Sequence, residues 1–198
     1  MNAAAVFRGL LASAALSAGL LGTTPIRADE ALWAKLAEGG KVVLMRHGSL
    51  KTGRGNGNSL VRDPSCRAER NLSDEGRQEA KAVGEQFRAH NIPIEAVRFS
   101  PYCRTAETAR IAFGNGSEVA YLSLLEVLGA EAQAAQTAEL NQVIGSYAGK
   151  GNLVLVTHEP NINAVSFEMM KPADFVVLQP KGGTEFEELG VVRSGGTD

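Results

Sequence analysis

Short apolar runs that alternate with helical patterns constrain the fold of this chain more than any other feature. Residues 41–45 (KVVLM) and 152–157 (NLVLVT) are compact and aliphatic, so each predicts a buried strand. Further strands are predicted at 96–100, 118–122, 175–179 and 185–192. We expect the last two of these at a sheet edge. The alternation predicts an α/β fold, a three-layer α/β/α sandwich with a mostly parallel sheet.

Cap residues predict where the helices between these strands begin. Ser73 is expected to cap a helix that ends near residue 90, because Asp74 and Glu75 suit its first turn. Ser100 followed by Pro101 predicts the start of a helix that runs to about residue 113. Other helices are predicted at 31–38, 130–147 and from Pro160 to about Met169. Residues 48–70 are rich in Gly, Asn, Ser and Arg and predict a long loop, a feature that is usually functional.

The first residues have the layout of a secretory signal peptide. A short segment with one positive charge precedes the small apolar block 9–21, and cleavage is expected after Ala28. The alternative is a retained membrane anchor, but the block is short for a bilayer span. We therefore expect a signal peptide at 1–28 and one domain at 29–198. The mature protein would be periplasmic or secreted, with no stable membrane span.

Charge and cysteine content narrow the possible partners. The 20 basic and 22 acidic side chains leave a net charge of −2, which gives no reason to expect nucleic acid or an anionic membrane as a partner. In an oxidising compartment Cys66 and Cys103 can form one disulfide, although two free buried thiols are the alternative. Their spacing does not favour zinc. The oligomeric state cannot be read from the sequence.

Polar side chains follow three of the predicted strands at the point where each strand ends. Arg46 and His47 come after the first strand, Arg104 follows the second, and His158 comes directly after residues 152–157. Ligands bind at the carboxyl ends of strands in open α/β sheets, so we expect these side chains to converge. Two arginines supply charged bidentate donors for a phosphate, and a histidine can act as a nucleophile. The sequence thus predicts a phosphoryl-transfer site and makes a metal site improbable beside two arginines.

Four ordered segments resemble the motifs of the histidine phosphatase superfamily, also called phosphoglycerate mutase-like. The segments are LMRHG, RNLSDEGRQEA, SPYCRTAETA and LVTHEPNI, and they extend from about residue 41 to 163. The resemblance implies that His47 becomes a phosphohistidine and that Arg46, Arg104 and His158 bind the phosphoryl oxygens. It implies no metal and no organic cofactor. One position departs from the family pattern, because Leu50 stands where Thr or Ser is common.

The resemblance leaves the general acid open between two carboxyl groups. Mutase-like members place a glutamate after the third strand, which is Glu126 here, whereas the acid phosphatase branch places it directly after the second histidine, which is Glu159 here. We favour Glu126. The pattern D-x-x-C-x-x-x-R-N-L also resembles a small periplasmic subgroup, and it suggests that a Cys66–Cys103 bridge ties the long loop to the helix that carries Arg104.

The function expected from these features is hydrolysis of phosphomonoesters through phosphohistidine. The substrate would be a small phosphorylated molecule, and a phosphorylated sugar of the cell envelope is the preferred candidate. A mutase would be expected to have a longer chain. Two further functions are compatible with the resemblance, namely a phosphohistidine-protein phosphatase and a non-catalytic phosphate-binding or anion-binding module of the same fold.

Overall fold

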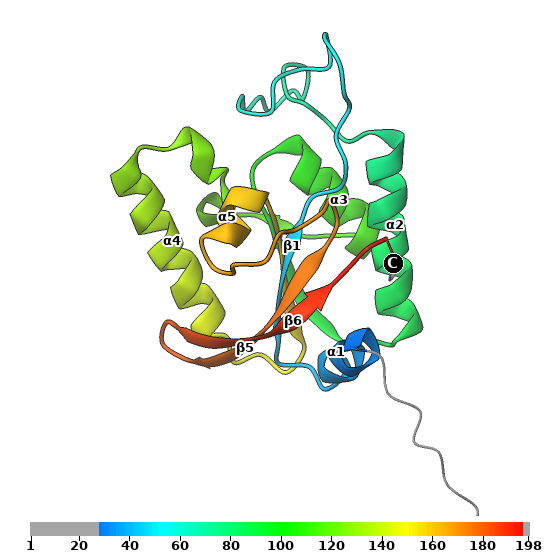
Figure 1. Cartoon of the computed structure of the whole chain (residues 1–198), viewed down its shortest axis with the longest axis vertical. Coiled ribbons are helices and arrows are strands. Elements are labelled where there is room, and N and C mark those ends of the chain that lie inside the picture. Colours follow the sequence, from blue (N-terminus) through cyan, green and yellow to red (C-terminus); the bar gives the residue numbers. More distant parts are fainter. Residues whose placement is uncertain (1–27, 196–198) are drawn as a thin grey trace, which may run out of the picture.

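A mixed six-stranded sheet forms the centre of the computed structural model, which describes residues 28–195 (Figure 1). The strand order is β3-β2-β4-β1-β5-β6. Strands β3, β2, β4 and β1 run parallel to one another, whereas β5 is antiparallel to both β1 and β6. The strand bounds are β1 Val42–Arg46, β2 Ile94–Phe99, β3 Ser117–Glu118, β4 Asn152–Thr157, β5 Phe175–Gly182 and β6 Glu185–Val192. Residues 1–27 of the predicted signal peptide lie outside the described part of the chain.

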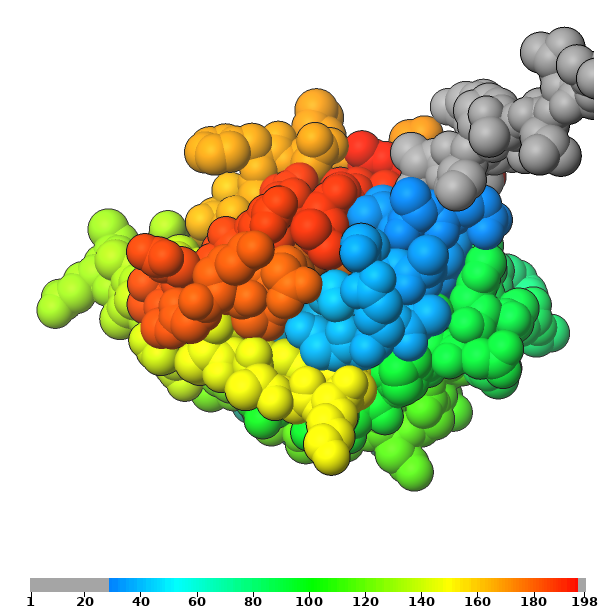
Figure 2. Space-filling view, turned by 90° about the horizontal axis from the view of Figure 1, so that it is seen from below, coloured from blue at the N-terminus to red at the C-terminus, as the bar shows by residue number. Residues whose placement is uncertain are grey.

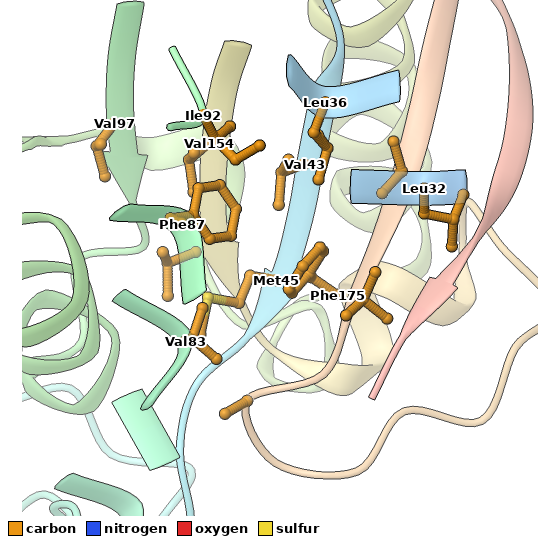
Figure 3. Packing of buried hydrophobic residues seen from close by; sticks show 14 of the residues in the cluster. Leu32, Leu36, Val43, Met45, Val83, Phe87, Ile92, Val97, Val154 and Phe175 are labelled. Carbon is orange, nitrogen blue, oxygen red and sulfur yellow. The ribbon is translucent and has the colours of Figure 1, made fainter. Parts of the chain in front are cut away.

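Helices cover both faces of this sheet, as the alternating pattern predicts. Their bounds are α1 Ala28–Ala37, α2 Asp74–Ala89, α3 Cys103–Phe113, α4 Ala130–Gly145 and α5 Glu159–Asn163, with short 3₁₀ helices η1 Ala120–Leu122 and η2 Leu125–Val127. Val43 and Met45 point toward the layer of α1, α2 and α3, where they share a core cluster with Phe87 of α2 and Phe175 of β5 (Figure 3). Val42 and Leu44 face the opposite layer, which contains α4 and α5. The predicted α/β/α sandwich with a mostly parallel sheet is therefore confirmed.

The end of the molecule opposite the long loop is closed by the first helix and the last two strands. Viewed from this end, α1 packs beside the hairpin of β5 and β6 (Figure 2). Among residues 28–195, no helix combines the length and the apolar character that crossing a bilayer requires.

The structure corrects the prediction that both final strands lie at the edge. Strand β5 lies between β1 and β6, and its first four residues are buried, so only β6 is an edge strand. A short apolar run flanked on both faces by helices is typical of an interior strand. The exposed glutamates of β6 suit an edge, because charged side chains discourage pairing with another chain.

Several element boundaries also differ from the prediction. Helix α3 begins at Cys103 and not after Ser100, because the Ser100 hydroxyl bonds to a histidine instead of a helix terminus. Helix α5 ends at Asn163, far short of Met169, whose side chain is exposed. The third strand ends at Glu118, and residues 120–122 form η1. The predicted Ser73 cap is confirmed, since its hydroxyl accepts the Gly76 N–H at 3.0 Å.

Candidate active site

The carboxyl ends of β1, β2 and β4 bring the predicted polar residues together. The main-chain ladder continues past the strands, since the His47 N–H donates to the Thr157 carbonyl at 3.1 Å and the Ser100 N–H to the Val156 carbonyl at 3.0 Å. The rings of His47 and His158 lie 5.4 Å apart. A cavity of about 310 Å³, called here the histidine cavity, is lined by these two rings and by Arg46, Leu50, Lys51, Thr52, Ser59, Arg70, Arg104, Leu124, Glu126, Glu159 and Pro160.

His47 is buried in a neutral, oriented form. Its Nδ1 lies 2.8 Å from the Gly48 carbonyl. A carbonyl oxygen only accepts hydrogen bonds, so Nδ1 carries the proton and Nε2 keeps its lone pair. Burial, and next the charge of Arg104, lower the pKa of His47 to about 3. The free Nε2 has no partner among the described residues and is available as a nucleophile.

Two glycines set the position of the main chain around His47. A β-carbon on Gly48 would lie 2.4 Å from the Gly76 carbonyl oxygen, and one on Gly76 would lie 2.1 Å from the Ser49 carbonyl oxygen. The turn after β1 therefore rests directly on the first turn of α2, where only glycine fits. The Gly48 N–H donates to Thr108 Oγ1 at 3.2 Å, which ties the same turn to α3.

His158 has the opposite tautomer. Arg104 Nη2 donates to its Nδ1 at 3.2 Å, and a guanidinium cannot accept, so the proton of His158 lies on Nε2. Nε2 in turn donates to Ser100 Oγ at 2.7 Å. Burial lowers the pKa of His158 well below its usual value, with the charge of Arg104 as the next cause. The sequence interpretation of Ser100 as a helix cap missed this role, although the residue lies within the SPYCRTAETA segment.

The two arginines present N–H groups that find no acceptor among residues 28–195. Arg104 is buried, its Nη2 also donates to the Ser59 carbonyl at 3.0 Å, and its guanidinium lies 4.3 Å from the centre of the Tyr102 ring. Its Nε and Nη1, together with Nε of Arg46, are buried without a hydrogen-bond partner in the described part of the chain. Burial lowers the pKa of Arg104 to about 10, so it remains charged at neutral pH. Unpaired buried donors are costly, and an anion in the cavity would satisfy them.

The two candidate acids differ in their surroundings. Arg46 Nη1 lies 2.8 Å from Glu159 Oε2 in an ion pair, and the same nitrogen donates to the Met170 carbonyl. Glu126 lies on η2 at the wall of the histidine cavity, and its carboxyl has no ion pair or hydrogen bond among the described residues. Asn161 holds the segment around it, accepting the Leu125 N–H at 3.3 Å and donating to the Ser123 carbonyl at 2.7 Å.

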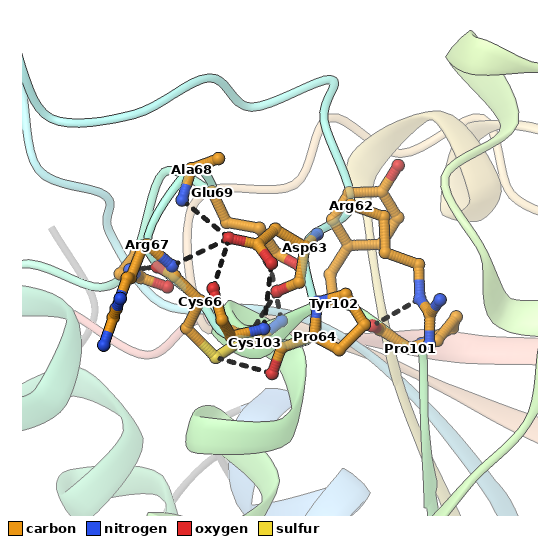
Figure 4. Close-up of a disulfide and its surroundings, with 12 residues drawn as sticks. Arg62, Asp63, Pro64, Cys66, Arg67, Ala68, Glu69, Pro101, Tyr102 and Cys103 are labelled. Carbon is orange, nitrogen blue, oxygen red and sulfur yellow. Dashed lines mark hydrogen bonds between the residues drawn. A yellow bond between two sulfur atoms is a disulfide. The ribbon is translucent and has the colours of Figure 1, made fainter.

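The predicted disulfide is confirmed, and it joins the long loop to α3 one residue before Arg104. Cys66 and Cys103 are bridged, with their α-carbons 5.8 Å apart (Figure 4). The buried carboxylate of Glu69 reinforces the junction, accepting the Cys103 N–H at 2.8 Å and the Asp63 N–H at 2.9 Å. The loop is therefore fixed against the helix that carries Arg104.

The described residues do not contain a group of side chains suited to a metal. Among residues 28–195, no three His, Cys, Asp or Glu side chains lie close enough together to hold an ion. The chemistry of the histidine cavity is that of an anion site built from arginine and neutral imidazole.

Comparisons with known proteins find one sequence-family match and several solved structures of similar fold. The sequence model described as "Histidine phosphatase superfamily (branch 1)" matches residues 42–126. Among solved structures, the protein histidine phosphatase SixA complexed with tungstate has a TM-score of 0.56 at 14% identity, covering 78% of this chain and 97% of that chain. A phosphoserine phosphatase variant from Entamoeba histolytica has a TM-score of 0.55 at 13% identity, covering 78% and 97%. A mycobacterial glucosyl-3-phosphoglycerate phosphatase has a TM-score of 0.51 at 16% identity, covering 75% and 96%. No curated protein sequence matches the chain.

Proposed function

We propose that the chain is a member of the histidine phosphatase superfamily, whose sequence model matches residues 42–126, and that it hydrolyses phosphomonoesters through a phosphohistidine on His47. The observation that carries this proposal is the neutral His47, whose Nε2 lone pair lines a cavity with unpaired arginine donors. A nucleophile needs such a lone pair, and a phosphoryl group needs such donors.

In the first step, Nε2 of His47 attacks phosphorus and the bond between phosphorus and the ester oxygen breaks. The departing oxygen takes a proton from a carboxylic acid, and the alcohol leaves. Arg46 and Arg104 bind the equatorial oxygens, where negative charge is concentrated during the transfer. His158 lines the same cavity and orients Arg104 by accepting a hydrogen bond from it. The Nδ1 proton remains shared with the Gly48 carbonyl and stabilises the imidazole as it becomes phosphorylated.

In the second step, water attacks phosphorus from the side that the alcohol has left. The carboxylate formed in the first step accepts a proton from this water, the bond between phosphorus and Nε2 breaks, and its electron pair returns to His47. The products are one alcohol and one inorganic phosphate for each ester and water consumed. The enzyme is thereby restored with the carboxyl protonated and Nε2 free.

We assign the acid to Glu126 and a positioning role to Glu159. The Glu159 carboxylate is held by Arg46 at 2.8 Å, so giving a proton to an alcohol would cost that ion pair. The Glu126 carboxyl is free of such a partner and stands at the cavity wall. A Glu126→Gln variant should therefore lose turnover of alkyl phosphates, whereas a Glu159→Gln variant should chiefly raise KM by loosening Arg46.

The proposed setting is the periplasm or the outside of the cell, with an envelope or extracellular phosphoester as substrate, for example a phosphorylated sugar. The layout of residues 1–28 supports export, and the Cys66–Cys103 disulfide suits an oxidising compartment. Secretion of a reporter fused behind residues 1–28, compared with the same fusion lacking them, tests this setting.

The function is tested with the mature protein, an aryl phosphate and a metal chelator. Wild-type protein should release phosphate, and a rapid quench should trap a phosphoryl group that is acid-labile, as expected of phosphohistidine. His47→Ala should abolish both signals. His90→Ala is the matched control, because His90 stacks on Trp33 at the far end of α2 and should retain both. Equal turnover by His47→Ala and wild type would refute the assignment of the nucleophile.

A further inference from the structure

A second hollow adjoins the histidine cavity through one of its acidic residues. It has a volume of about 970 Å³ and lies between α4 and α5, and we call it the amide groove. The amide groove and the histidine cavity share Glu126 and Pro160 in their linings. A molecule bound in both would therefore pass directly over the Glu126 carboxyl.

The geometry of phosphoryl transfer decides which part of a substrate lies there. In-line attack places the leaving oxygen on the side of phosphorus opposite to His47 Nε2. The group that protonates the leaving oxygen must be within hydrogen-bond reach of it. With Glu126 as that group, the alcohol portion continues past Glu126, and the space beyond this residue is the amide groove.

The lining of the amide groove is polar but carries almost no charge. Its polar side chains are Gln133, Thr137, Asn141 and Asn163, which supply amide and hydroxyl groups. Asn141 Oδ1 is buried and has no hydrogen-bond partner among the described residues, so a hydroxyl group of a ligand could donate to it. Among the described residues, no lysine or arginine contributes to the lining, and Glu126 is its one ionisable residue.

Small side chains leave room between these polar groups. Ala134 and Ala138 of α4 lie on the groove wall, and Ala134 is exposed. Alternating methyl groups and amides match the surface of a sugar ring, which has apolar C–H faces and a rim of hydroxyls. An anionic leaving group would find no cation here and would meet the Glu126 carboxylate once the proton had left.

Another cavity, which is basic, does not lie beside Glu126. It has a volume of about 680 Å³ beside the disulfide and is lined by Lys51, Arg62, Arg77 and Arg110. Two of these cations are already paired, Arg62 with Glu118 and Arg77 with Glu107. This cavity shares Lys51 with the histidine cavity but does not include Glu126, so an alcohol held there would lie away from the acid.

We propose that the amide groove is the leaving-group subsite and that it accepts a neutral polyhydroxylated alcohol, such as a sugar ring. This inference rests on the proposed phosphatase function, which it makes more specific. Gln133, Thr137 and Asn141 of α4 bind the hydroxyl groups, and Ala134 allows the ring to lie against the helix.

The test fills the groove and compares substrates with and without a sugar. Ala134→Phe places a large ring on the groove wall, and Ala135→Phe places the same ring on an exposed position of the same helix outside the groove. Both variants and the wild type are assayed with two substrates. The first is the phosphate ester of an uncharged hexose, and the second is acetyl phosphate, whose leaving group is too small to fill the groove. Circular dichroism confirms that each variant folds.

We expect Ala134→Phe to raise KM for the hexose phosphate by at least tenfold, with kcat/KM for acetyl phosphate within twofold of wild type and Ala135→Phe unchanged on both. Equal effects of the two variants on the hexose phosphate would overturn the inference. The inference would also be overturned if the wild type hydrolysed acetyl phosphate but no phosphate ester of an uncharged sugar. That result would leave the proposed function standing. Failure of the wild type on both substrates, with no phosphohistidine trapped, would remove the proposed function itself.

Discussion

Removal of the Cys66–Cys103 disulfide tests how much the stability of the protein and the position of the long loop depend on this cross-link. The bridge joins residues 37 positions apart, and its loss as Cys66→Ser/Cys103→Ser frees the unfolded chain to adopt more conformations. The chain-entropy relation for a loop of that length corresponds to about 4 kcal/mol at 25 °C. We therefore expect the free energy of unfolding of the double variant to fall by that order.

The same substitution should also lower activity, because the loop supplies a contact to Arg104. The Ser59 carbonyl on the loop accepts Arg104 Nη2 at 3.0 Å, and Glu69 on the loop holds the Cys103 N–H. Without the bridge these hydrogen bonds alone keep the loop in place. We expect kcat/KM to fall by about tenfold, since a small displacement of a phosphate-binding group is costly for transfer.

Urea unfolding followed by fluorescence gives the stability change, and hydrolysis of an aryl phosphate gives the activity change. Wild-type protein treated with a reductant should reproduce both changes, and the double variant should not respond to reductant. A Ser65→Ala variant, altered in the same loop with the bridge intact, serves as the control. A loss of stability below about 1 kcal/mol, with unchanged kcat/KM, would refute the reasoning that the bridge fixes the loop and Arg104.

Three further predictions concern single side chains. Gly48→Ala would place a methyl group 2.4 Å from the Gly76 carbonyl, so His47 should shift and kcat should fall by about 100-fold, measured with an aryl phosphate. Asn161→Ala should release the segment that carries Glu126, and kcat should fall more for alkyl than for aryl phosphates, because a poor leaving group needs the acid most. Burial lowers the pKa of His47 from 6.5 to about 3, so between these pH values the unfolded chain holds a proton that the folded chain lacks. Stability should therefore fall as the pH is lowered from 6.5 toward 3, by at most about 5 kcal/mol for this residue, and His47→Gln should show a shallower loss in urea unfolding at pH 7 and pH 4.

The strands that end at the site could be predicted from the sequence, because a buried strand appears there as a short, uninterrupted run of apolar residues. The run 152–157 coincides with β4, which is buried at every position. The interior position of β5 was not predictable in the same way, because the run 175–179 has the same composition whether one neighbour or two pair with it. Strand order is decided by contacts between segments far apart in the chain, here β5 with β1 and β6.

The ends of the helices show a related limit. Ser100 followed by Pro101 is a strong local start signal, yet α3 begins at Cys103. The Ser100 hydroxyl is taken by His158, which lies 58 residues away, and the Cys103 N–H is satisfied by Glu69 from the loop. Partners that are distant in sequence replaced the local cap, so a rule based on neighbouring residues placed the helix start too early.

The assignment of the acid depends on contacts of the same long-range kind. Sequence reasoning placed Glu126 and Glu159 beside the same site and could favour one only through resemblance. In the fold, Glu159 directly follows His158 and its carboxylate forms an ion pair with Arg46 at 2.8 Å. Glu126 is carried by a segment without regular strand or long helix, which Asn161 holds by its side chain. A carboxyl without a partner on an anchored segment can approach the leaving oxygen in one orientation. The same residue lines both the histidine cavity and the amide groove. Under the proposed mechanism, the residue that donates the proton is also the residue that lies between the phosphoryl group and the alcohol.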